Sequence, residues 1–164
     1  MDPITSLQLR ELFLAELYQM YWFENAWITM LGRLGRSTCL PQLGSALKKE
    51  RAYSQEHVSR LRQIFRSIGG QPDSRECQTL TGLITDLENA SACMDDNNMA
   101  CDLSFILAVL KASHYQISTY NGMLQLAGAL HFQEASGLIK DTLEEEKQTI
   151  QDLTALLSIH TSNL

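Results

Sequence analysis

Apolar residues recur at alternating spacings of three and four along most of this chain, which is the spacing that gathers them on one face of a helix. This pattern predicts four long helices and one shorter helix between the second and the third of them. In chain order the expected ranges are 6–34, 40–67, 74–89, 99–127 and 132–160. Residues 94–98 are predicted to form a polar loop or a helix start.

The helix breakers agree with these boundaries. Pro3, Pro41 and Pro72 fall at the edges of the periodic stretches, and Gly69-Gly70 follows the second one. No sustained two-residue alternation indicates a strand. Long helices joined by short turns pack antiparallel to one another. We therefore predict an all-α, antiparallel four-helix bundle with an additional short helix between helices 2 and 3, forming one domain over residues 1–164.

Each long helix has a predicted inward seam that is apolar at both ends and polar near its middle. The polar positions are Glu24, Glu50, Ser54, His57, Ser113 and Glu146. On the third long helix the predicted seam is Leu103, Ile106, Leu110, Ser113, Ile117, Tyr120 and Leu124. On the fourth it is Ile139, Leu143, Glu146, Ile150, Leu153 and Leu157. The rest of the run 144–147 is expected to be a solvated face. Since a buried carboxylate is costly unless it is paired, hydrogen-bonded or bound to a cation, a polar layer is predicted.

Carboxylates and histidines on facing helices are the ligands of dinuclear iron and manganese sites in helix bundles. The full site needs a Glu on each of two helices and an inward Glu-x-x-His on each of the other two. No such motif faces inward here, and Glu50 and His57 are two turns apart. The remaining candidates for a residual iron or manganese site are Glu24, Glu50, His57 and Glu146.

Three interpretations of this layer stay open at the level of the residues. The polar groups hydrogen-bond one another with help from Tyr53, Gln116 and Tyr120, or they hold a single or weakly bound metal. Alternatively, the seam is displaced by one position, and Glu24 or Glu146 reaches solvent. A lone buried histidine such as His57 is more often structural than a ligand.

Composition excludes several classes of function. The net charge of −6 and the absence of a basic run argue against nucleic-acid binding. No apolar stretch approaches the roughly 18–20 residues that cross a bilayer, and the stretch Met1-Asp2-Pro3-Ile4 lacks the basic and apolar regions expected of a signal peptide. Four cysteines without a C-x-x-C pair indicate reduced thiols, and we expect a cytoplasmic protein. No nucleophile elbow or phosphate loop is present, and His114, His131 and His160 are expected at the surface or at helix ends.

Aromatic residues surround the first predicted helix on more than one side, and a single seam cannot cover them. Exposed aromatic patches often mark interfaces. We therefore predict a homodimer that packs partly through Tyr18 and Trp22. The alternative is that the short additional helix covers this face. No other protein partner is indicated.

Several segments resemble the YciE/YciF-type family of bacterial ferritin-like proteins. They include 11–24 in the first helix, 58–65 before the Gly69-Gly70 turn and Cys77 with 82–84 in the short helix. His114-Tyr115 with Tyr120, and the run 142–147, are similar to its third and fourth helices. The resemblance implies a ferritin-like, dimeric bundle associated with bacterial stress responses, whose biochemical activity is not established.

The family commonly carries acids and histidines that suggest a metal site, and this chain matches that pattern at Glu24, His57, Glu145 and Glu146. It departs where Tyr53 and Ile150 replace acids, and where Ser113-His114-Tyr115-Gln116 lacks both acids of a Glu-His-Tyr-Glu pattern. Divalent metals need anionic ligands, so these changes indicate a degenerate, metal-free centre. The leading hypothesis is a non-enzymatic stress-associated protein. The competing hypothesis is a metal-dependent oxidase or peroxide-handling protein whose metal site has fewer ligands than usual.

Overall fold

The computed structural model describes residues 2–91 and 99–162, and the predicted polar stretch 94–98 lies outside these ranges. Within them the chain forms helices and no strand. The helices are α1 (Pro3–Leu34), α2 (Pro41–Ser67), α3 (Gln78–Ser91), α4 (Met99–Ala129) and α5 (Gln133–Thr161). The predicted helices are thus all present, and their boundaries differ from the prediction by up to four residues.

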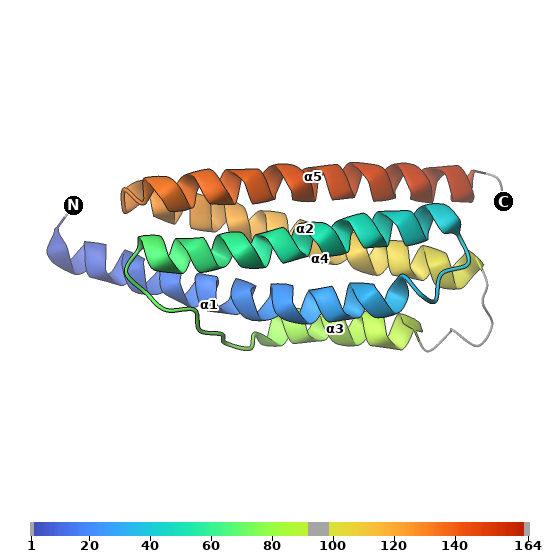
Figure 1. Ribbon diagram of the computed structural model, residues 1–164, viewed down its shortest axis with the longest axis horizontal. Helices are drawn as coiled ribbons and strands as arrows, with labels where there is room; N and C mark the ends of the chain where they lie inside the picture. The colour runs from blue at the N-terminus through green and yellow to red at the C-terminus, as the bar shows by residue number, and fades with distance from the viewer. Residues whose placement is uncertain (1, 92–98, 163–164) are drawn as a thin grey trace.

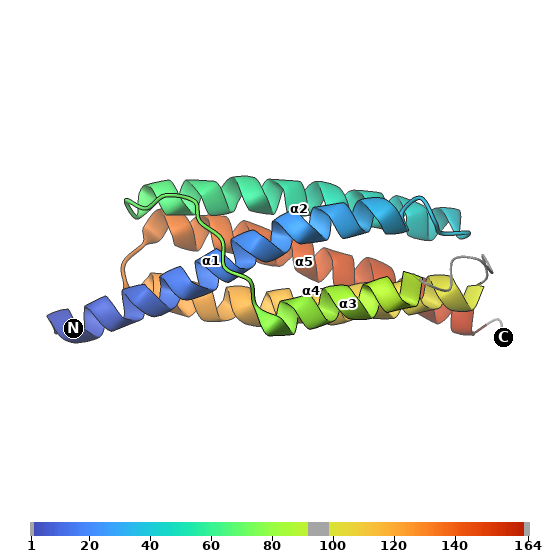
Figure 2. The ribbon, with the colours of Figure 1, turned by 90° about the horizontal axis from the view of Figure 1, so that it is seen from below.

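The long helices α1, α2, α4 and α5 form the bundle, and α3 lies outside it against α4 and α1 (Figures 1 and 2). The α1–α2 and α4–α5 hairpins pack through α2 against α5 and through α1 against α4. Because α3 carries the chain back along the length of the bundle, α2 and α4 run in the same direction (Figure 1). One long crossover of this kind characterises ferritin-like bundles. The predicted ferritin-like, all-α fold is confirmed.

Helix ends explain the differences in boundary. The α1 helix begins three residues earlier than predicted because the Asp2 carboxylate accepts the Ile4 amide at 2.9 Å and Pro3 takes the first turn, where its missing N–H costs nothing. The N-cap residue of α2, Leu40, has no side chain that caps. Buried Asp102 of α4 replaces it by accepting the Leu40 N–H at 2.7 Å and the Cys39 N–H at 3.1 Å.

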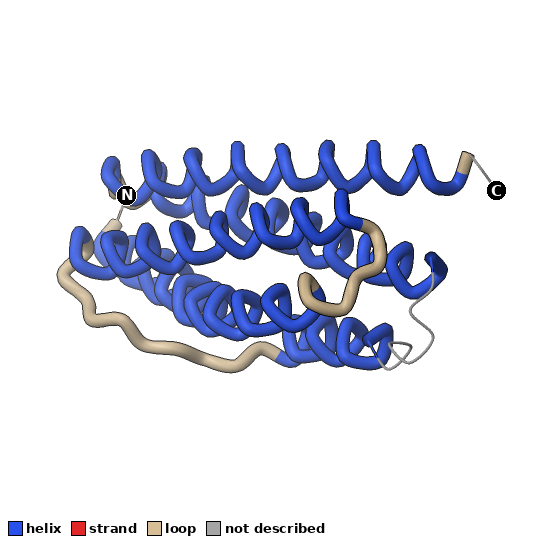
Figure 3. Tube along the Cα trace, turned by 45° about the vertical axis from the view of Figure 1, so that its right-hand side comes forward, coloured by secondary structure: helices blue, strands red, loops and turns tan. Residues whose placement is uncertain are grey.

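A long connection joins α2 to α3 (Figure 3) and crosses the outside of α1 (Figure 2). It begins at Gly69, whose φ of 73° is in the left-handed region that glycine adopts without strain. Two hydrogen bonds attach it to α1: Arg10 Nη2 donates to the Ile68 carbonyl at 2.9 Å, and the Arg75 N–H donates to the Tyr18 carbonyl at 3.2 Å. The connection is therefore fixed near both of its ends.

The aromatic face of α1 is partly covered. Tyr18 stacks on Phe65 with ring centroids 5.6 Å apart, and the Arg75 guanidinium lies over the Tyr18 ring. Tyr18 and Trp22 are both half-buried and pack against the core. Part of each ring is left exposed, and the homodimer stays a prediction.

The seam predicted on the third long helix is wrong in its width. Ile106, Ser113 and Tyr120 are buried as predicted, but Leu103, Leu110, Ile117 and Leu124 are only half-buried. The reason is that α4 packs against α1, α3 and α5 together, so a wide face is covered. Its further buried residues are Cys101, Asp102, Phe105, Ala108, Val109, Ala112, Gln116, Met123 and Ala127. On α5, likewise, Thr149 and Leu156 are buried and Ile150 and Leu157 are half-buried.

Candidate functional site

Polar side chains meet at the middle of the bundle, between apolar layers at both ends. Glu24, Glu50, His57 and Glu146 are each 0–2% exposed. The predicted polar layer therefore exists, and all four candidate residues face inward. The alternative in which Glu24 or Glu146 reaches solvent is wrong.

Glu24 lies at the centre of a hydrogen-bond network. Its Oε1 atom accepts from the Tyr120 hydroxyl at 2.8 Å and from Gln116 Nε2 at 3.0 Å, and it lies 3.2 Å from His57 Nδ1. These groups come from α1, α2 and α4, so one carboxylate oxygen joins three helices. Gln116 and Tyr120 satisfy the layer as predicted. Tyr53 does not join it and lies half-buried under the Lys49 ammonium.

Gln116 connects Glu24 to the fourth helix of the bundle. Its side-chain nitrogen also donates to Glu146 Oε1 at 2.9 Å, so the amide bridges two buried carboxylates. His57 Nδ1 lies 3.6 Å from the same Glu146 oxygen. Glu24, His57 and Glu146 thus bring one potential ligand atom each to within 4.8 Å of one another. The order of the residues along the chain gave no indication of this bridge, although Gln116 was expected to help satisfy the layer.

The second ring nitrogen of His57 contacts Glu145, a residue that the predicted seam placed in solvent. This Nε2 atom lies 3.0 Å from Glu145 Oε2, and Arg60 binds both oxygens of that carboxylate. The Glu145 side chain is 22% exposed and the Arg60 side chain 16%. Sequence periodicity missed both residues, and only the family resemblance pointed to Glu145. A usable signal existed, since Arg60 is three residues after His57 and therefore on the same face of α2.

Glu50 lies beside this cluster and has a separate partner. Its Oε2 atom accepts a short hydrogen bond from the Thr149 hydroxyl of α5. Burial raises its pKa, and the negative charge of Glu24 adds to the increase. Of the four predicted ligands, therefore, Glu24, His57 and Glu146 come together, and Glu50 is outside their group.

His57 is held as a cation. Burial by itself lowers the pKa of an imidazole, but the charge of Glu24 and the hydrogen bonds to Glu145 and Glu24 outweigh it and raise the pKa of His57 to about 10. With both ring nitrogens facing carboxylates, each N–H donates to one of them. On the other side of the pair, Arg60 and His57 outweigh the effect of burial and lower the pKa of Glu145 to about 2.

Glu146 has the opposite environment to Glu145. Burial and the negative charges of Glu50 and Glu24 raise its pKa well above the ordinary value, although His57 opposes them. These surroundings favour the protonated form of the Glu146 carboxyl group. The pKa values of the adjacent residues Glu145 and Glu146 therefore shift in opposite directions because one faces a guanidinium and the other faces acids.

The donor set fits a two-metal site poorly. A single ion finds three ligand atoms, and Glu24 Oε2, Glu146 Oε2, Glu50 Oε1 and Gln116 Oε1 are buried oxygens with no hydrogen-bond partner in the described parts of the chain. Around them, however, stand the hydrogen-bond donors Gln116 Nε2 and Tyr120 OH and the imidazolium of His57. Two divalent ions need more anionic ligands than Glu24 and Glu146 supply.

Comparison with known proteins places the chain in a family. Residues 8–163 match the family described as a domain of unknown function, DUF892. The chain belongs to this family. Protein YciF of Escherichia coli K12 is 29% identical to this DUF892 chain over 149 residues, which cover 90% of it and 89% of YciF. The predicted resemblance to YciE/YciF-type proteins is confirmed.

Solved structures of similar proteins have the same fold as this DUF892 chain. The crystal structure of the stress protein YciF from E. coli matches with a TM-score of 0.86 at 28% identity, covering 95% of this chain and 98% of YciF. YcfI from Rhodopseudomonas palustris matches with a TM-score of 0.82 at 22% identity, covering 89% and 92% of the two chains. At that identity the second match supports the fold alone.

Other sequence expectations concern residues outside the centre. His114 and His131 are exposed, and His160 is half-buried in the last turn of α5, as predicted. Across residues 2–91 and 99–162, no helix is both long enough and apolar enough to cross a membrane.

Proposed function

We propose that this DUF892 protein is a non-enzymatic, stress-associated module of the cytoplasm whose bundle centre is metal-free and held by hydrogen bonds and protons. One observation carries this proposal. The Gln116 amide donates to both Glu24 and Glu146, at 3.0 and 2.9 Å, so a neutral donor joins the two carboxylates that a metal ion would have to join.

Charge balance supports the same conclusion. The cations His57 and Arg60 face the anions Glu24 and Glu145, while burial and the neighbouring acids raise the pKa of Glu146 and favour its protonated form. A divalent ion added to this set would compete with these cations for the same carboxylates. It would first have to displace the proton of His57, because a metal binds only neutral imidazole.

A second function has its own supporting observation. Three buried carboxylate oxygens, Glu24 Oε2, Glu50 Oε1 and Glu146 Oε2, have no hydrogen-bond partner among the described residues. Such oxygens favour a cation. Together with His57 they would form an iron or manganese site with fewer ligands than usual, as in an oxidase or a peroxide-handling protein. We rank this function second because the surrounding donors compete with an ion for the same carboxylates.

Metal analysis separates the two functions. The untagged protein is purified, its iron, manganese and zinc contents are measured, and its melting temperature is compared with and without a chelator. We expect substoichiometric metal and an unchanged melting temperature. Near-stoichiometric metal together with a melting temperature that the chelator lowers would overturn the metal-free proposal. A protein that is free of metal and unaffected by added iron would overturn the second function.

The Gln116→Glu variant tests the bridging amide directly. It replaces a neutral donor by an anion between Glu24 and Glu146, so the metal-free variant is expected to be less stable and to gain stability when Mn²⁺ is added. Gln125→Glu, at an exposed position of the same helix, is the matched control with the same change of charge. An equal response of both variants to Mn²⁺ would contradict the role of Gln116.

We also propose that the protein acts as a homodimer through α1. Tyr18 and Trp22 leave part of their rings exposed, and α1 also carries Ile4, Leu7 and Leu12, which are 71%, 57% and 49% exposed. Apolar residues that gather on one helix favour an interface. The test is the mass in solution at micromolar concentration, with Trp22→Glu expected to give the monomer. A monomeric unmodified protein would overturn the proposal.

A further inference from the structure

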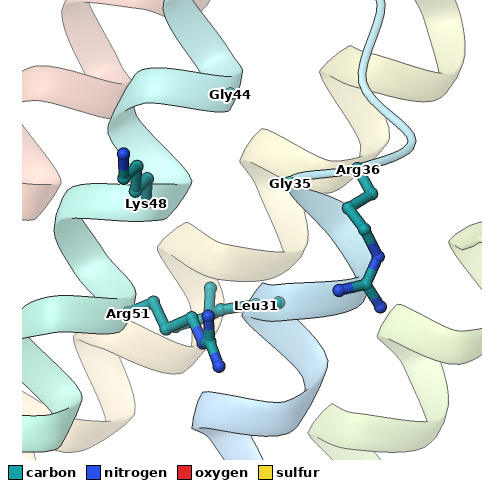
Figure 4. Close-up of a pocket in the computed structure, with 7 residues that line it drawn as sticks. Leu31, Gly35, Arg36, Gly44, Lys48 and Arg51 are labelled. Atoms are coloured by element: carbon teal, nitrogen blue, oxygen red, sulfur yellow. The ribbon is translucent and has the colours of Figure 1, made fainter.

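A cavity lies between the end of α1 and the start of α2, away from the buried centre. It has a volume of about 230 Å³ and is lined by Leu31, Gly32, Gly35, Arg36, Gly44, Lys48 and Arg51. Figure 4 shows that Arg51 reaches from α2 toward Leu31 of α1, with Lys48 one turn away on α2 and Arg36 in the turn after α1. Three of the lining residues are cations, and no acid lines the cavity.

Glycines create the space. A side chain at Gly44 would come within 3.3 Å of Thr38 Oγ1, and one at Gly35 within 3.3 Å of the Leu31 carbonyl. Because these two glycines have no side chains, the last turn of α1 and the first turns of α2 come close together and still leave a cavity between them. A Cβ atom at Gly32 would lie 3.3 Å from Arg51 Nε, so this glycine makes room for the guanidinium group to lie against α1.

The cations of this corner divide into paired and unpaired sets. Among residues 33–51, Arg33 pairs with Glu88 and Lys49 with Asp152. Arg36, Lys48 and Arg51 form no ion pair within the described parts of the chain. These three are the residues that line the cavity, in a protein whose net charge is −6.

Helix dipoles do not account for the cluster. A cation after the last turn of α1 offsets the negative end of that helix, which explains Arg36, but the effect fades within one turn. Lys48 and Arg51 lie two or more turns inside α2, beyond its reach. Arg51 is instead oriented by a hydrogen bond from Nε to the Ile28 carbonyl at 3.2 Å. Its two Nη groups donate no hydrogen bond within the described residues, so they are available to bind a ligand.

We propose that this cavity binds the phosphate group of a small phosphorylated molecule. Arginine forks match phosphate oxygens in pairs, and lysine adds a point charge, so two arginines and a lysine suit a dianion. The cavity is smaller than the 300–1,000 Å³ typical of drug-sized ligands, which favours a phosphate monoester over a dinucleotide. The three cations are exposed, so they close on the ligand by side-chain rotation and binding is of modest affinity.

The test is a titration of the full chain with inorganic phosphate at constant ionic strength. Backbone amide NMR spectra monitor the binding. We expect one saturable site, with the largest shifts at the amides of Gly32, Gly35 and Gly44. Parallel titrations use phenyl phosphate, to separate free phosphate from a phosphomonoester, and succinate, as a dicarboxylate of equal charge. Tighter binding of phenyl phosphate supports the proposal. Tighter binding of succinate, or the absence of saturation, overturns it.

Variants of equal charge complete the experiment. Arg36→Gln/Arg51→Gln is expected to weaken phosphate binding by about tenfold or more, which corresponds to about 1.4 kcal/mol. The control is Arg66→Gln/Lys140→Gln, which removes two exposed positive charges elsewhere. Equal weakening by both double variants would show general screening and overturn the site. If either variant fails to fold, the glycine shifts of the unmodified protein decide.

Discussion

The buried centre and the basic cavity lie on opposite faces of the same helix, and they handle charge in opposite ways. On the inner face of α2, His57 is bound by carboxylates of α1 and α5. On the outer face, Lys48 and Arg51 are exposed and unpaired among the described residues. The difference teaches that burial decides how a charge is balanced. A buried charge needs a partner or a proton within the fold, whereas an exposed one is balanced by water and remains free to bind a ligand.

The largest expected effect comes from removing the buried cation. His57→Ala leaves the Glu24 carboxylate buried without a counter-charge, so we expect the free energy of unfolding to fall by about 3–5 kcal/mol. Chemical denaturation followed by circular dichroism measures this change. His114→Ala, at an exposed position of α4, is the control and should change stability by no more than about 0.5 kcal/mol. Similar losses in both variants would remove the distinction between the two kinds of region.

The pH dependence sharpens the comparison because burial and charge shift the pKa values of several groups in the buried centre. The folded pKa of His57, about 10, exceeds its unfolded value of 6.5, so its contribution to stability is complete below pH 6.5 and disappears as the pH rises toward 10. Burial also raises the pKa values of Glu50 and Glu146, so each of these groups loses stability in the same direction as the pH rises from its unfolded toward its folded pKa. Each proton lost changes stability by up to about 1.4 kcal/mol per pH unit.

We therefore expect unfolding free energies to decrease from pH 7 to pH 9 by about 2 kcal/mol or more. The groups that face His57 are Glu24 from α1, Arg60 from α2, Tyr120 from α4, and Glu145 and Glu146 from α5. His57→Gln should flatten the decrease. Glu145 affects stability at low pH instead. Its folded pKa of about 2 is below its unfolded value of 4.5, so its contribution to the free energy of unfolding disappears as the pH falls from 4.5 toward 2. A centre that held a metal would instead gain stability as the pH rises, because protons compete with the ion.

The buried side chain of Asp102 tests whether a buried acid always needs a proton or a cation. Buried Asp102 is balanced by the N–H groups of Cys39 and Leu40 at the start of α2. Asp102→Ala is expected to lower the free energy of unfolding by about 1–3 kcal/mol through loss of these bonds. Asp102→Asn, which keeps one acceptor oxygen, should recover part of the loss in the same denaturation experiment. No loss in the alanine variant would mean that the backbone groups find other partners.

The smallest effect is expected on the outer face of α2. Lys48→Gln removes an exposed charge without a described partner, so the free energy of unfolding should change by no more than about 0.5 kcal/mol. Differential scanning calorimetry is sensitive enough to detect such a change. A loss approaching that of Asp102→Ala would show that this face, too, contributes to the stability of the fold.

Periodicity alone predicted the bundle, the short helix and the burial of Glu24, Glu50, His57 and Glu146. It succeeded because these residues lie on seams whose flanking positions are apolar. It missed Arg60 and Glu145, whose long side chains reach the centre from positions that are not on the seam. It also missed Asp102, because a cap supplied by another helix 62 residues away leaves no local pattern.

The width of the buried face of α4 was unpredictable for a related reason. A seam of three and four spacings describes a helix with two neighbours, but α4 has three. Gln116 is accordingly buried one turn from where the seam alone would set the polar position of that helix. The opposite pKa shifts of adjacent Glu145 and Glu146 were also beyond the sequence, because they arise from the charges that the fold places around each residue.

The exposed connection over residues 71–76 has a consequence for how the molecule is assembled. A cut there divides the chain into an α1–α2 piece and an α3–α4–α5 piece, without breaking any helix. The first piece carries Glu24 and His57, and the second carries Gln116, Tyr120, Glu145 and Glu146. The buried centre therefore joins the two halves, and its polar contacts form in one relative register. Reassembly of the cleaved halves in a single alignment would depend on it.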